Sequence, residues 1–67
     1  MKVGDFVNTP RFCKVELAAV FPCPCFARER GFVEPTHFQN DQWEIWGKHT
    51  GKDMMIFAAI LKHAVLV

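Results

Sequence analysis

The sequence contains no serine and no tyrosine, and it carries almost no net charge. Without serine the chain cannot form a serine-nucleophile triad, and without tyrosine it has no phenolic acid or base for catalysis. Eight Lys and Arg residues against seven Asp and Glu residues give a formal charge of +1. This balance excludes a strongly basic nucleic-acid binder and an acidic decoy.

Long apolar runs and a regular cysteine framework are also missing. The longest apolar run covers residues 54–61, and even extended to residue 67 it falls short of the ~20 residues that a membrane-spanning helix needs. The first residues are not followed by the apolar segment of a secretory signal. The three cysteines are an odd number, whereas small disulfide-stapled domains normally have an even set. We therefore expect free thiols, no membrane contact and a cytoplasmic location.

The residues that are present have the composition of one small folded domain over 1–67, with 51% hydrophobic and 22% charged residues. Apolar residues alternate along 12–21 until Pro22 and Pro24 interrupt the pattern. The short helix that follows has to dock through the apolar residues near its end, and Gly31 suits the left-handed position that ends a helix. The expected elements are strands at 2–7 and 12–21, a helix at 24–30, and strands at 36–39, 42–48 and 54–61, with the docking residues Phe26, Ala27 and Phe32.

The run at 54–61 is ambiguous because it is apolar on both faces, and Asp53 could cap a helix there. A strand is favoured, since 42–48 alternates and a short loop would join the two runs as a hairpin. The sequence thus predicts an α+β fold: a small antiparallel sheet of four to five strands with one short helix packed on a face, in the order β-β-α-β-β-β.

Two resemblances bear on this prediction. The string Ala27-Arg28-x-x-Gly31-Phe32-x-Glu34-Pro35-Thr36-His37-Phe38, followed by Glu44-Ile45-x-Gly47-Lys48, resembles small uncharacterised proteins of conjugative transposons and related mobile elements in Gram-positive bacteria. It covers about half of the chain and implies a soluble accessory protein of a mobile element, with no catalytic residue and no mechanism. The opening Gly4-Asp5-Phe6-Val7 resembles the first strand of SH3-like small barrels, which is the alternative fold.

The alternation in 42–48 also suggests an interaction surface. It places Trp43 and Ile45 on one face of a strand and Trp46 on the other. A two-turn helix covers only part of a sheet, so the face of Trp46 is covered either by that helix or by a partner. Trp, Met and Phe are enriched at the centres of protein interfaces. The candidate interaction residues are Trp46, Phe57, Met55 and Phe12.

Two further groups of residues give alternative functions. A modest basic patch beside Phe12 could contact nucleic acid through Arg11, Lys14, Arg28 and Arg30. The pair Cys23-Pro24-Cys25 could hold a soft metal with Cys13, His37 or His49, or provide a reactive thiol, although the spacing is not that of zinc knuckles and small packing residues are the simpler explanation. The one catalytic triad that the composition allows is Cys25, His37 and Glu34.

From these patterns we expect no enzyme and no cofactor. The leading hypothesis is a non-catalytic protein-interaction module that self-associates or binds a protein partner, because a 67-residue chain without disulfides has reason to bury an apolar face. The alternatives are a small nucleic-acid-binding domain and a thiol or metal-binding protein built on Cys23-Pro24-Cys25.

Overall fold

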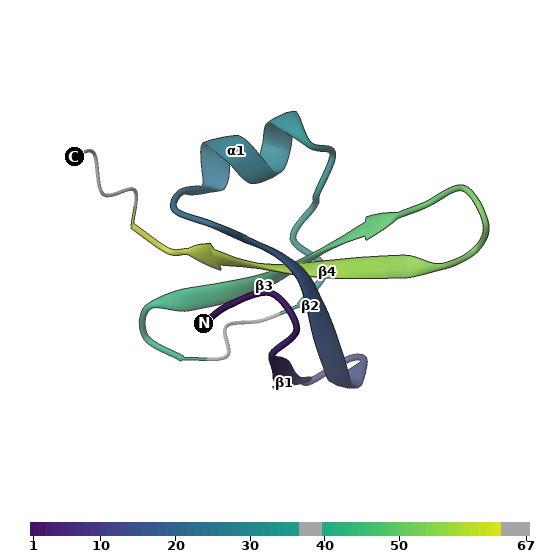
Figure 1. Ribbon diagram of the computed structural model, residues 1–67, viewed down its shortest axis with the longest axis horizontal. Helices are drawn as coiled ribbons and strands as arrows, with labels where there is room; N and C mark the ends of the chain where they lie inside the picture. Colours follow the sequence, from purple (N-terminus) through teal and green to yellow (C-terminus); the bar gives the residue numbers. More distant parts are fainter. Residues whose placement is uncertain (37–39, 64–67) are drawn as a thin grey trace.

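The computed structural model describes residues 1–36 and 40–63, which form one four-stranded sheet and one short helix (Figure 1). The α+β prediction is confirmed at this level. The strands lie side by side in the order β1-β2-β4-β3. In chain order the elements are β1 Phe6–Thr9, β2 Cys13–Phe21, α1 Pro24–Glu29, β3 Trp43–His49 and β4 Met55–Leu61.

The sheet is not purely antiparallel, which corrects the prediction. β2 and β4 run parallel at its centre, whereas β1 pairs with β2 and β3 pairs with β4 in antiparallel fashion. Parallel neighbours need a long crossover, and here α1 and β3 both lie between the two strands in the chain. Among the described residues the sheet is open, with β1 and β3 at its edges, so the SH3-like barrel alternative is wrong.

Most of the strand expected at 36–39 falls on residues that the structure does not describe. Residues 37–39 lie outside the described residues, and Thr36 belongs to no strand. A single bridge forms slightly earlier, where the amides of Val33 and Gly47 donate to each other's carbonyls at 2.8 and 2.9 Å. Pro35, two residues after Val33, has no amide hydrogen and so limits this contact with β3 to one residue pair.

β2 connects two parts of the sheet because its two halves have different neighbours. Phe6 to Thr9 of β1 pair with the first half of β2, and β4 pairs with the second half. The register shifts between Leu17 and Ala19, as at a β-bulge, and a bulge changes which face the following side chains occupy. The alternating apolar residues of β2 are therefore divided between the two sides of the sheet.

Each face of the sheet carries its own apolar cluster, and α1 covers one of them (Figure 1). The helix-side cluster contains Phe21, Ala27, Phe32, Trp46, Ala58 and Ile60. The opposite cluster contains Val15, Leu17, Ile45, Phe57 and Ala59. Consecutive residues of β3 and β4 alternate between the two clusters, as strand geometry requires.

The ambiguous run 54–61 is a strand, and it forms the expected hairpin with β3. Ala58, Ala59 and Ile60 are fully buried although they point to both faces. A strand that is apolar on both sides fits the centre of a sheet covered on both sides, which explains why its periodicity was ambiguous.

α1 ends at the predicted glycine. Gly31 has a φ of +86°, its amide donates to the Arg28 carbonyl, and the Phe32 amide donates to the Ala27 carbonyl at 3.0 Å. This pair of hydrogen bonds is a Schellman motif, and it turns Phe32 into the helix-side cluster. Docking uses Ala27 and Phe32 as expected, but Phe26 is exposed.

The Gly31 conformation gives a direct test of the helix end. Gly31→Ala should lower the free energy of unfolding by about 1 kcal/mol, because a Cβ is disfavoured at positive φ. Gly31→Asn should lose less, since Asn tolerates this region better than Ala. Thermal unfolding of the parent and the two variants measures this order of stability. Equal stability of all three proteins would mean that the helix does not end in this way.

Candidate functional site

The predicted interaction residues do not form one exposed surface. Trp46 and Phe57 are core residues, 4% and 7% exposed, and they belong to clusters on opposite faces of the sheet. Met55 is half-buried, while Phe12 is exposed and its ring centroid lies 5.2 Å from that of Phe57. Trp43 and Trp46 do face opposite sides, but α1 covers the side of Trp46, so this tryptophan is a core residue of the monomer.

Trp46 is held by polar as well as apolar contacts. Its indole nitrogen donates to a Glu44 carboxylate oxygen at 2.8 Å, and the guanidinium of Arg28 lies 5.5 Å from the ring centroid. Glu44 is itself buried at 9% exposure, and its hydrogen bond with the indole satisfies part of its polar surface. These contacts fix Trp46 under α1.

A second carboxyl group lies beside Glu44. The pKa of Glu34 is raised because its carboxyl shares a hydrogen bond with Glu44, is partly desolvated and feels the negative charge of Glu44, while Arg28 acts in the opposite direction. A neighbouring carboxyl group that accepts its hydrogen bond disfavours the ionised form of Glu34. This pair was missed from the sequence because Glu34 and Glu44 belong to different segments and no local pattern links them.

The predicted basic residues fall into two groups at different ends of the molecule. Arg28 and Arg30 are on or next to α1, with guanidinium groups over the rings of Trp46 and Phe21. Arg11 lies in the turn between β1 and β2, and Lys14 lies near the start of β2, which is the end of this strand away from α1. They do not form a single basic patch.

The turn between β1 and β2 gathers exposed aromatic and basic side chains. Lys14 Nζ lies 5.1 Å from the Phe6 ring centroid, and the Arg11 guanidinium lies 5.8 Å from that of Phe12. Val3, Phe6 and Phe12 are exposed at 64%, 60% and 37%. We call this group the hairpin surface, defined by Val3, Phe6, Arg11, Phe12 and Lys14.

Local hydrogen bonds hold the hairpin surface in place. The Thr9 hydroxyl donates to the Cys13 carbonyl at 3.0 Å and accepts from the Phe12 amide at 2.9 Å. Arg11 Nη1 donates to the Pro35 carbonyl at 3.1 Å, which ties the turn to the connection that crosses the sheet. Thr9 is buried, so the turn is anchored in the domain while its aromatic rings remain accessible.

A shallow depression of about 340 Å³ adjoins this surface. It lies where β2 changes register, next to the start of β4, and Met55 contributes to its wall. Its lining residues are Val3, Glu16, Leu17, Ala18, Met55 and Ile56. Two of the four predicted interaction residues, Phe12 and Met55, are thus on or beside the hairpin surface.

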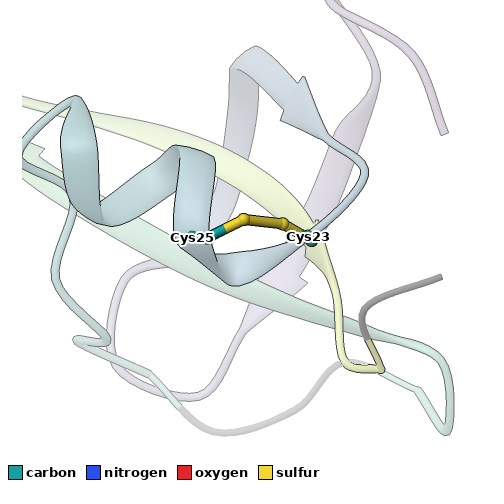
Figure 2. Close-up of a disulfide and its surroundings, with 2 residues drawn as sticks. All are labelled: Cys23 and Cys25. Carbon is teal, nitrogen blue, oxygen red and sulfur yellow. A yellow bond between two sulfur atoms is a disulfide. The ribbon is translucent and has the colours of Figure 1, made fainter. Parts of the chain in front are cut away.

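The cysteines differ from the expectation of free thiols. Cys23 and Cys25 form a disulfide, which joins the segment entering α1 to the first turn of the helix (Figure 2). Cys23 is extended and Cys25 is helical, and this change of direction brings their Cα atoms to 5.5 Å, within the normal range for a disulfide. Cys13 is a free, exposed thiol, as expected.

The proposed metal site finds no geometric support among the described residues, and the possible catalytic triad includes His37, which lies outside them. Over residues 1–36 and 40–63 no three His, Cys, Asp or Glu side chains gather in a group that could hold a metal ion. His49 is exposed at the end of β3, and His37 lies outside the described residues. The described helix is too short and too polar to cross a membrane.

No protein-family model, curated protein or solved structure matches this chain. The candidate function therefore depends on the geometry of the hairpin surface and of the disulfide.

The carboxyl pair predicts a pH dependence of stability. Because folding raises the pKa of Glu34, its contribution to stability is present at pH values below its ordinary pKa and is lost as the pH rises through the raised value. Glu34→Gln should flatten this fall and stabilise the protein at neutral pH by less than about 1 kcal/mol, since the group is exposed and screened. Melting temperatures measured from about pH 3 to about pH 8, a range that spans the pKa values of carboxyl groups, give the profile.

Arg28→Gln provides the opposite change for comparison. Arg28 lowers the pKa of Glu34, so its loss should move the fall in stability to higher pH. Identical pH profiles for the parent and Glu34→Gln would show that the two carboxyl groups do not interact.

Proposed function

We propose that this chain is a small protein-interaction module that self-associates as a two-fold dimer through the edge of β1 and the hairpin surface. The observation that carries the proposal is an edge strand with apolar side chains in water. β1 neighbours only β2 among the described strands, and Phe6 and Val3 beside it are more than half exposed. An exposed, apolar sheet edge is a template for pairing with another strand.

The backbone of β1 supports strand pairing. The Leu17 amide donates to the Asp5 carbonyl at 2.9 Å, and bonded positions alternate along an antiparallel ladder. This alternation turns the backbone groups of Phe6 and Asn8 away from β2. A two-fold pairing centred on Val7 then joins Phe6 of one copy to Asn8 of the other.

The charges around β1 favour a second copy as the partner. Asp5 precedes the strand, and Arg11 and Lys14 follow its end. In an antiparallel two-fold pair the start of one strand lies beside the end of the other, so acidic and basic groups approach each other. With a formal charge of +1 per chain, two copies repel each other only weakly.

Dimerisation would also bury apolar surface that the monomer leaves exposed. A chain of this size buries a small core, and association is one way to gain further apolar burial. The hairpin surface offers that burial, whereas Trp46 does not, because α1 already covers it.

Sedimentation and light scattering across micromolar to millimolar concentrations test the proposal, in a Cys13→Ser background that prevents disulfide-linked dimers. The parent should show a reversible monomer–dimer equilibrium. Phe6→Glu should raise the dissociation constant by about tenfold or more, the effect of losing one buried aromatic contact. Asn8→Pro should weaken pairing as well, because it removes an outward amide donor without breaking the ladder to β2.

Met54→Glu is the matched control. Met54 is as exposed as Phe6 but lies in the loop between β3 and β4, so its replacement should leave the dissociation constant unchanged. A parent that stays monomeric at every concentration contradicts the proposal. So does a dimer that Met54→Glu weakens as much as Phe6→Glu does.

A further inference from the structure

The Cys23–Cys25 disulfide is too short a cross-link to serve mainly as a staple. One residue, Pro24, separates the two cysteines. The stabilisation that a disulfide gives by restricting the unfolded chain grows with the length of the loop it closes, so it is smallest for such a ring. The bond joins backbone positions that the chain itself already keeps close together.

The two sulfur-bearing residues differ in access to solvent. Cys23 is buried at 5% exposure, whereas Cys25, in the first turn of α1, is exposed. Thiol–disulfide exchange begins with attack of a thiolate on one sulfur of the bond. Of the two cysteines, Cys25 is the residue exposed to an incoming thiolate, and attack there makes Cys23 the sulfur that leaves.

The flanking prolines keep the reduced pair ready to close again. Pro22 and Pro24 have fixed φ angles, and Cys23 between them is extended. Reduction therefore leaves the two thiols on a backbone with few alternative conformations. Oxidation of the pair does not require the chain to search for its partner sulfur.

We propose that Cys23 and Cys25 form a redox-active pair that exchanges its disulfide with a dithiol of another protein or small molecule, by attack at Cys25. A thiolate of the dithiol attacks Sγ of Cys25, the Cys23–Cys25 bond breaks, and its electron pair leaves on Sγ of Cys23, which takes up a proton. The second thiolate of the substrate then attacks the first substrate sulfur, which is bonded to Sγ of Cys25 in the mixed disulfide. This closes the substrate disulfide and releases the Cys25 thiolate. The substrate is oxidised to a disulfide, and the pair is reduced by the same two electrons.

This activity is independent of the proposed dimer. Cys25 lies at α1, and the hairpin surface lies at the other end of β2, whose nine residues span roughly 25 Å. Cys13, the free thiol, begins β2 at that far end and takes no part in the exchange. The pair can therefore be studied in a Cys13→Ser background.

The first experiment equilibrates this Cys13→Ser protein with buffers of reduced and oxidised glutathione, followed by acid quenching and mass analysis of the alkylated thiols. We expect a single two-electron transition within the range that glutathione covers, with an unchanged circular dichroism spectrum in the reduced form. A disulfide that resists glutathione, or a protein that unfolds when the bond is reduced, would show a structural bond and overturn the proposal.

The second experiment compares the two sulfurs. In the reduced protein, iodoacetamide should modify Cys25 faster than Cys23 by about tenfold or more, because reactivity follows access to the thiolate. With oxidised glutathione, Cys23→Ala should form a mixed disulfide through Cys25, whereas Cys25→Ala should form little through the buried Cys23. Equal reactivity of the two thiols in the reduced protein, or of the two variants, contradicts the assigned direction of attack.

Discussion

The structure depends on hiding both faces of β4 from water. No side chain from Met55 to Leu61 is charged or hydrogen-bonding, and Ala58, Ala59 and Ile60 are fully buried. A strand of this kind needs a neighbour on each edge and a cover on each face. β2 and β3 supply the neighbours, and α1 with Phe32 covers one face. On the other face Pro35 packs so closely over Gly47 that a Cβ there would lie 3.0 Å from its ring, while the Thr36 hydroxyl donates to the Ile45 carbonyl along the outer edge of β3.

The proposed functions involve the parts of the chain that stay exposed to solvent once β4 is covered. Once the helix and the crossing connection cover the sheet, β1 remains as a short edge strand with Phe6 and its neighbours in solvent. The entry to α1 requires a sharp change of direction after β2, and the Cys23–Cys25 disulfide lies at that point, with one cysteine buried and one exposed. Association through the edge and exchange at the disulfide thus occupy opposite ends of β2.

Local pattern predicted the features that depend on local geometry. Alternation located β2 and β3 to within about a residue, and Gly31 marked the end of the helix. Pattern did not predict the parallel pairing of β2 and β4, because periodicity identifies a face but not the neighbouring strand. The register shift after Leu17 was hidden as well, since Ala18 and Val20 make both sides of that run apolar.

The candidate site was harder to predict because it depends on which side chains the tertiary structure buries and which it leaves exposed. The alternation placed Trp46 opposite Trp43 correctly, but only the position of α1 shows that Trp46 is buried. The odd number of cysteines suggested free thiols, yet an odd set can contain a pair and one free thiol.

The central claim, that the domain is built around β4, is tested most directly by amide hydrogen exchange followed by NMR. The account predicts that the amides of Phe57 to Ile60 exchange slowest, at the rate of global unfolding, and that those of β1 exchange much faster. Exchange in β4 as fast as in β1 would contradict it.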